Sequence, residues 1–138
     1  MIYALDTNVI IHYLKGHDEV KNNLNKAAFE GCQLIIPRAV DYEICRGLLL
    51  LSATKKIATY NEILSLDGQF KIASMGENIW EYAKNIYVQL KRKGFTVGEI
   101  DMLIGAFCLH HDYTLVTDNT KDFVNINGLR LVNWTEAL

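Results

Sequence analysis

Proline is almost absent from this sequence of 138 residues, because Pro37 is the only one. The chain also shows no internal repeat and no low-complexity tract that would mark a linker between domains. Half of the residues are hydrophobic and 22% are charged, a balance that favours a folded core over disorder. The sequence therefore predicts a single domain that spans residues 1–138.

Cysteine and long apolar runs are scarce as well. The three cysteines, Cys32, Cys45 and Cys108, are odd in number and form no Cys-x-x-Cys pair, so neither a disulfide framework nor a zinc site is indicated. The first residues lack a positively charged leader segment, and the longest strongly apolar stretch is far below the about 20 residues that span a bilayer. We expect free thiols in a soluble, cytoplasmic protein without membrane contact.

An excess of positive charge is missing too, since 14 Lys and Arg residues stand against 16 Asp and Glu residues, for a formal net charge of -2. This balance argues against a protein that is held on nucleic acid by bulk positive charge. It is compatible with an enzyme that has a local basic path across its surface.

What the sequence does contain is an alternation of short apolar runs with segments of helical spacing. The runs that predict strands are 2–5, 34–36, 70–72, 114–117 and 129–132. The segments that predict helices are those from Asp6 to Gly16, 18–29, from Pro37 through Leu48, 54–64, 77–91 and 100–109. Strands that alternate with helices indicate an α/β domain with a central, mainly parallel sheet.

Several helix ends are marked by capping residues. Thr7 or Asn8 is expected to cap the first helix, and the basic run 91–93 with Gly94 is expected to end the helix over 77–91. The segment 96–99, Thr-Val-Gly-Glu, has the pattern of a capping box before the apolar run 100–109. That role accounts for Glu99, which could also support a nearby site.

Four acidic residues stand near the carboxyl ends of the predicted strands. Asp6 and Asp118 directly follow strands, Glu43 lies two turns into a helix, and Asp101 lies early in the helix after the capping box. Each has an ordinary interpretation by itself, as a cap, a helix-surface acid or a turn residue. Ligands of parallel sheets bind beyond the carboxyl ends of the strands, so the matched placement predicts that the four converge.

Such a cluster predicts a metal centre. Two unit charges about 5 Å apart at an effective dielectric near 20 repel by about 3 kcal/mol, so four carboxylates need a proton or a cation. Oxygen ligands without His or Cys partners select Mg²⁺ or Mn²⁺. We expect Asp6, Glu43 and Asp101 to hold the principal ion, directly or through water, and Asp118 to complete the set and recruit a second ion.

Neighbouring polar residues are expected to support these acids. Hydrogen bonds from Thr7 and Asn8 could orient Asp6, and the hydroxyl of Thr117 could lie near the ion or the phosphate. Asn119 is a further candidate for such a supporting position. The basic candidates for phosphate contact are Arg46, Lys91, Arg92 and Lys93, for which a solvated helix surface is the alternative.

The acids lie in segments that resemble the motifs of a known family. The segments 5–10 (Leu-Asp-Thr-Asn-Val-Ile), 41–47 (Asp-Tyr-Glu-Ile-Cys-Arg-Gly), 101–106 (Asp-Met-Leu-Ile-Gly-Ala) and 116–119 (Val-Thr-Asp-Asn) resemble, in order, the four motifs of the PIN-domain family. Residues 122–123 and the tail 128–134 fit the same pattern. Each motif is short, but four in the right order are specific.

The likeness is closest to PIN-domain ribonucleases of the VapC toxin type. It implies a PIN-like three-layer α/β/α domain and a Mg²⁺- or Mn²⁺-dependent endoribonuclease that inhibits translation, often by cutting tRNA. Hydrolysis would leave a 3′-hydroxyl and a 5′-phosphate. The likeness also implies a small VapB-like antitoxin and a homodimer. Gly105 stands where alanine is common, and we expect this change to matter little.

The apolar part of the helix after Pro37, Ile44 with residues 48–51, should lie partly in the core and partly on an antitoxin or dimer face. Three other readings compete with a nuclease. A phosphatase of the haloacid-dehalogenase type needs a second Asp where Asn8 stands, and a receiver domain needs an adjacent acidic pair and a late lysine. A PIN-like RNA- or protein-binding module without catalysis would differ by showing no metal-dependent cleavage.

Overall fold

The computed structural model describes residues 1–65 and 69–136. Its strands are β1 (Ile2–Leu5), β2 (Gln33–Pro37), β3 (Phe70–Ala73), β4 (Thr114–Val116) and β5 (Leu131–Val132). Its helices are α1 (Thr7–Leu14), α2 (Asp18–Phe29), α3 (Arg38–Leu50), α4 (Thr54–Ser65), α5 (Ile79–Arg92), α6 (Glu99–His111) and α7 (Thr120–Phe123). Every predicted strand and helix is present, and the ends differ by a few residues.

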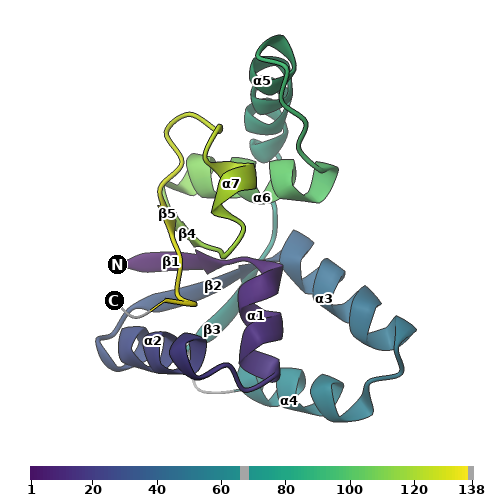
Figure 1. Cartoon of the computed structure of the whole chain (residues 1–138), viewed down its shortest axis with the longest axis vertical. Helices are drawn as coiled ribbons and strands as arrows, with labels where there is room; N and C mark the ends of the chain where they lie inside the picture. The colour runs from purple at the N-terminus through teal and green to yellow at the C-terminus, as the bar shows by residue number, and fades with distance from the viewer. Residues whose placement is uncertain (66–68, 137–138) are drawn as a thin grey trace.

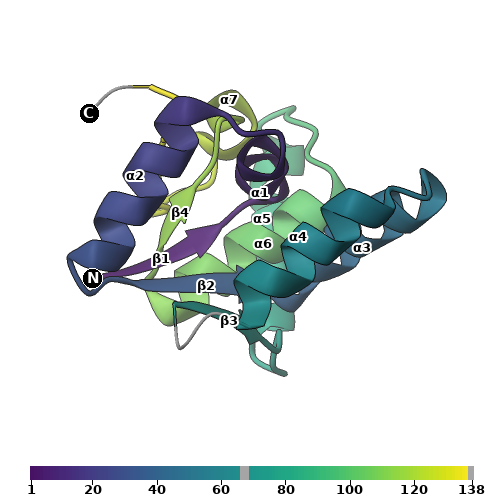
Figure 2. The same ribbon diagram turned by 90° about the horizontal axis from the view of Figure 1, so that it is seen from below.

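The strands form one parallel sheet in the order β3-β2-β1-β4-β5. Figure 1 draws α1 to α4 below this sheet and α5, α6 and α7 above it. The view from below in Figure 2 places α1 to α4 in front of the strands and α6 behind them. The prediction of a three-layer α/β/α domain is therefore confirmed.

The core explains why the two central strands, β1 and β4, end in apolar residues. In β1 and β4 the residues Ala4, Leu5, Leu115 and Val116 are all fully buried, on both faces of the sheet. Strands of a parallel sheet with helices on both sides show this continuous burial rather than alternation. The first polar residue after each of these strands therefore lies at the edge of the core, where the chain leaves the sheet.

Two predicted caps are wrong. The cap of α1 is Asp6, whose carboxylate accepts a hydrogen bond of 2.8 Å from the main-chain N–H of Thr7. The cap of α6 is Gly98, not Thr96, and Glu99 is the first helical residue. The backbone turns into the helix only there, and the N–H of Met102 bonds to the carbonyl of Gly98 at 3.0 Å. This later start places Asp101 in the first turn of α6.

Two further expectations are settled by the fold. The helix α5 ends at Arg92 with Lys93 as its cap, and Gly94 adopts a φ of 78°, so the predicted end is confirmed. The three cysteines carry free thiols. Among residues 1–65 and 69–136, no helix combines the length and the apolar character that crossing a bilayer requires.

Gly105 lies in the middle of α6 against the buried side chain of Ile126. A Cβ at this position would lie 2.9 Å from the Cδ1 atom of Ile126, the nearest neighbour. Because this atom is the end of a side chain, a small shift of Ile126 can accommodate it. The close approach of Ile126 to the helix explains why glycine, which has no Cβ, fits this position.

We expect Gly105→Ala to change the free energy of unfolding by less than about 1 kcal/mol, because the gain of about 1 kcal/mol in helix propensity offsets the shift of Ile126. Gly105→Val should destabilise by about 1–3 kcal/mol through overpacking. Unfolding in urea measures the free energy of unfolding of both variants. A loss above about 2 kcal/mol in the alanine variant would show that Ile126 cannot move.

Candidate active site

The carboxyl ends of β1 and β4 meet α3 and α6 around a cavity of about 350 Å³. The residues that line it are Asp6, Thr7, Asn8, Ile11, His12, Glu43, Asp101 and Asn119. Three of the four predicted acids thus surround one space, although they come from three separate segments. The fourth, Asp118, does not line this cavity.

Asp6 is the most deeply placed of these acids, with an exposed fraction of 2%. Its carboxylate accepts hydrogen bonds from the N–H of Thr7 at 2.8 Å, the hydroxyl of Thr117 at 2.7 Å and the amide of Asn8 at 2.9 Å. Burial raises its pKa, these donors lower it, and the charge of Glu43 raises it again, with a net increase. The three donors fix the direction of the carboxylate.

Glu43 is held on both of its oxygens. The hydroxyl of Thr7 donates to Oε1, and the guanidinium of Arg46, one turn along α3, lies 3.7 Å from Oε2. Thr7 therefore supports two acids, Asp6 through its main chain and Glu43 through its side chain. The helix α3 brings Glu43 to the cavity because its apolar side packs in the core through Ile44.

Asp101 has a strongly raised pKa. Burial, followed by the charges of Asp6, Glu43 and Asp122, raises its pKa to about 6. The acids are thus close enough for the charges of Asp6 and Glu43 to oppose the ionisation of Asp101. Asp122, in the segment 122–123 that fits the family pattern, also contributes to this shift, and its Oδ2 accepts a hydrogen bond of 2.7 Å from the amide of Asn119.

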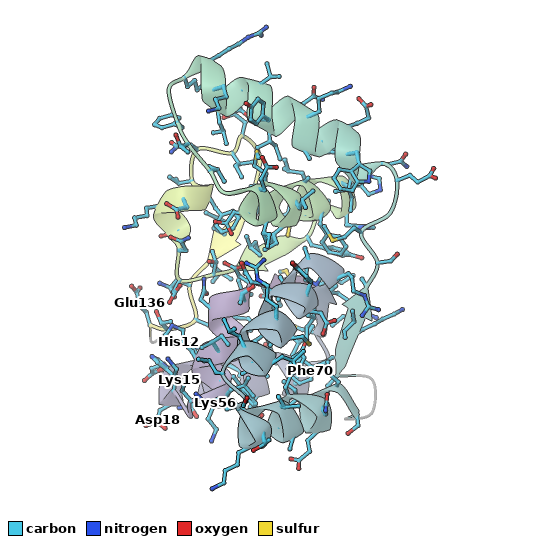
Figure 3. All side chains as sticks on the ribbon, turned by 90° about the vertical axis from the view of Figure 1, so that its right-hand side faces the viewer. His12, Lys15, Asp18, Lys56, Phe70 and Glu136 are labelled. Atoms are coloured by element: carbon cyan, nitrogen blue, oxygen red, sulfur yellow. The ribbon has the colours of Figure 1, made fainter. Side chains whose placement is uncertain are left out.

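The side chain of Asp118 contacts His12, a partner that the sequence did not suggest. Its Oδ2 lies 2.6 Å from Nε2 of His12, and its main-chain N–H donates to the amide oxygen of Asn8 at 3.1 Å. Asn8 and His12 are one turn apart on α1, so together they hold both the backbone and the side chain of Asp118. In the sequence, the only signal for this arrangement was the four-residue spacing of Asn8 and His12 on a predicted helix. Figure 3 labels the side chain of His12.

The predicted basic residues lie at different distances from the acids. Arg46 lines a second hollow of about 250 Å³ together with Glu43, Glu99 and Asp101. Its guanidinium also lies 5.1 Å from the ring centre of Tyr42. Lys91 lines a separate hollow beside α5, and Arg92 and Lys93 are exposed at the end of that helix. Arg46 is therefore the cation placed beside the acids.

The donor set suits a hydrated divalent cation. Within the described ranges no three His, Cys, Asp or Glu side chains form a group that could already hold a metal ion. Mg²⁺ keeps several of its waters and needs only one or two direct carboxylates, so three acids around a cavity of this size fit it. Burial raises the pKa of both Asp6 and Asp101, so ionising them is costly, and a bound cation would offset that cost.

The model of the PIN domain family matches residues 3–129. The chain belongs to the PIN-domain family. Its sequence is 41% identical over 130 residues to ribonuclease VapC1 of Rickettsia felis, covering 93% of this chain and 92% of that protein. It is 25% identical over 138 residues to the tRNA(fMet)-specific endonuclease VapC of Salmonella typhimurium, covering 96% and 97%.

The solved structures agree with this assignment. The crystal structure of VapBC2 from Rickettsia felis bound to a DNA fragment from its promoter contains a chain with a TM-score of 0.88 and 29% identity. The match covers 97% of this PIN-domain chain and 99% of that chain. The protein therefore falls in the VapC branch of the family, whose nucleases depend on a metal ion.

The raised pKa of Asp101 gives a test of the metal centre. An acid with a raised pKa is costly to ionise in the folded state, so wild type loses stability as pH rises from 3.8 through about 6. Asp101→Asn removes this loss. In EDTA the variant should have a Tm roughly 3–6 °C above wild type at pH 8, and the difference should shrink towards pH 4.

Added Mg²⁺ should raise the Tm of wild type and leave that of Asp101→Asn nearly unchanged, because a ligand stabilises only the state that binds it. Glu62→Gln, an exposed acid on α4, is the matched control and should behave as wild type in both measurements. Equal stabilisation of Asp101→Asn by Mg²⁺ would remove Asp101 from the metal site.

Proposed function

We propose that this chain is a Mg²⁺- or Mn²⁺-dependent endoribonuclease toxin in which Asp6, Glu43 and Asp101 hold the ion. The observation that supports this most is the meeting of three carboxylates, Asp6, Glu43 and Asp101, around one open cavity. Bound there, the ion would supply a polarised phosphate and an activated water for hydrolysis. The name ribonuclease, which the VapC relatives carry, supports RNA as the substrate.

The protein's own side chains have separable roles in this reaction. Thr7, Asn8 and Thr117 hold the acids in one orientation through the hydrogen bonds described above, so the site is organised before substrate arrives. Arg46 lies beside Glu43, where its guanidinium can exchange the carboxylate for a phosphate of the RNA. Asp118, held by His12 and Asn8, completes the acid set at the rim.

The relatives also indicate the class of substrate and partner. The Salmonella relative is named as specific for tRNA(fMet), which supports tRNA as the substrate of this chain. The VapBC2 complex supports a small VapB-type antitoxin as its partner. We propose that the toxin acts as a homodimer and that its cleavage of tRNA inhibits translation until the antitoxin binds.

The end of α3 offers a surface for the antitoxin. Ile44 and Leu48 are buried, as expected, whereas Leu49, Leu50 and Leu51 are exposed. A hollow of about 100 Å³ between α3 and α4 adjoins them and is lined by Leu48, Leu49 and Ile57 among others. An apolar segment of an antitoxin would bury these leucines.

Asp6→Asn should reduce RNA cleavage on the order of a thousandfold or more, because charge stabilisation by a catalytic metal is worth several kcal/mol. The fold should be kept, since asparagine has the same size and its single oxygen can still accept from Thr117 and Asn8, so that only the bond from the N–H of Thr7 is lost. Cleavage of labelled tRNA is the measurement, with Asp18→Asn on α2 as control. Full activity in Asp6→Asn, or cleavage in EDTA that added metal leaves unchanged, would contradict the proposal.

His12 and Asp118 should act as one unit. We expect His12→Ala and Asp118→Asn each to slow cleavage by about 10-fold to 100-fold. The double variant should be no slower than the slower single variant, because each change already breaks the same contact. Losses that multiply would show that the two residues act independently.

A further inference from the structure

Aromatic and basic side chains alternate along one side of α5. Trp80, Lys84, Tyr87 and Lys91, here called the α5 stripe, follow one another at intervals of four, three and four residues, which places them on one face of the helix. Trp80 and Tyr87 are exposed by 61% and 46%. In Figure 3 the helix lies along the top of the molecule, with side chains that project outward.

Two hollows of about 230 and 260 Å³ lie along this stripe, between α5 and the start of α6. Tyr87 and Glu99 line both, and Phe95 lines the larger one. Glu99 also lines the hollow that Arg46 shares with Asp101, which itself adjoins the carboxylate cavity. The stripe is therefore continuous with the active site along the molecular surface.

We propose that the α5 stripe binds single-stranded RNA next to the scissile bond, an inference that rests on the proposed nuclease function. Bases stack on the rings of Trp80 and Tyr87, and the ammonium groups of Lys84 and Lys91 contact the phosphates between them. Single-strand binding sites combine these two features, because every base has a stacking face and every linkage carries a charge.

The cations of the stripe are available to a phosphate. Lys84 lies 2.8 Å from Glu81, but both side chains are well exposed, and an exposed pair of this kind contributes little. Lys91 lies 5.6 Å from the ring centre of Tyr87 and has no carboxylate among its ion-pair partners in the described residues. The carboxylate of Glu99 on the opposite wall repels phosphate, so the RNA backbone keeps to the lysine side.

Charge also favours RNA over a second copy of the chain as the occupant. The centres of protein interfaces are enriched in aromatic residues but depleted in lysine. Two of the four residues in the α5 stripe are lysines, so an interface between two copies would bury two ammonium groups. The same lysines match the charge of a nucleic-acid backbone.

Tryptophan fluorescence tests the stacking directly. The chain has two tryptophans, of which Trp80 is exposed and Trp134 is buried with an exposed fraction of 3%. Titration of the inactive Asp6→Asn protein with a 12-nucleotide single-stranded RNA of mixed sequence should quench the emission. The quenching should be lost in the protein that also carries Trp80→Phe. Equal quenching in that variant would overturn the stacking.

Binding of the same RNA by anisotropy tests the whole stripe. Trp80→Ala with Tyr87→Ala should weaken binding at least about tenfold without changing the salt dependence. Lys84→Glu with Lys91→Glu should weaken it and reduce the slope of log affinity against log salt by about 1.4, or about 0.7 for each lost phosphate contact. Lys21→Glu with Lys26→Glu, and Phe29→Ala, all exposed on α2, are the matched controls.

Three outcomes would overturn the inference. The stripe variants could bind RNA as tightly as the controls, or all charge-reversed variants could lose the same affinity. Alternatively, sedimentation could show that the stripe variants dissociate a dimer while RNA affinity per chain is unchanged, which would make this face a contact between copies. A wild type that fails to cleave RNA would overturn the proposed nuclease function instead, because the binding measurements use an inactive protein.

Discussion

The buried charge of Asp6 is the constraint on which the rest of this structure depends. A carboxylate that leaves water without partners is costly, and here the fold supplies three donors in place of water. Two come from the start of α1 and one from Thr117, directly after β4. Because β1 lies between β2 and β4 in the sheet, the strand order itself brings these donors together. The apolar runs of β1 and β4 thus determine where the site lies.

The three acids of the cavity are not equivalent. Asp6 is fixed by three donors, and Glu43 is held by Thr7 and Arg46. Asp101 accepts no hydrogen bond from the described residues that would offset its burial, and its pKa is raised to about 6. Asp6 and Glu43 therefore form the organised part of the site. Asp101 is the acid whose ionisation a cation would favour most, so cation binding and its deprotonation are coupled.

The sequence predicted the layers of the fold and the acids at the strand ends because both follow from hydrophobic pattern and topology. It missed the pairing of His12 with Asp118, since the direction of a side chain in a loop depends on which neighbour it meets after folding. The capping box failed for a similar reason. Thr96 matched a local pattern, but the cap of α6 is Gly98, two residues beyond, and the helix begins at Glu99. Tertiary contacts therefore determine the start of α6 and the direction of the Asp118 side chain, and local sequence patterns do not predict them.

The net charge acquires a different meaning once the acids are located. Apart from the four acids predicted for the site, the chain has 12 acidic residues, and these are outnumbered by 14 Lys and Arg residues. Salt screens exposed charges beyond about 8 Å at physiological ionic strength, so a mildly basic surface elsewhere cannot draw a phosphate to an acidic pocket. Only cations next to the pocket can do so, and Arg46, 3.7 Å from Glu43, is such a cation. If the proposed nuclease function holds, its recognition of RNA therefore depends on particular neighbouring cations, not on total charge.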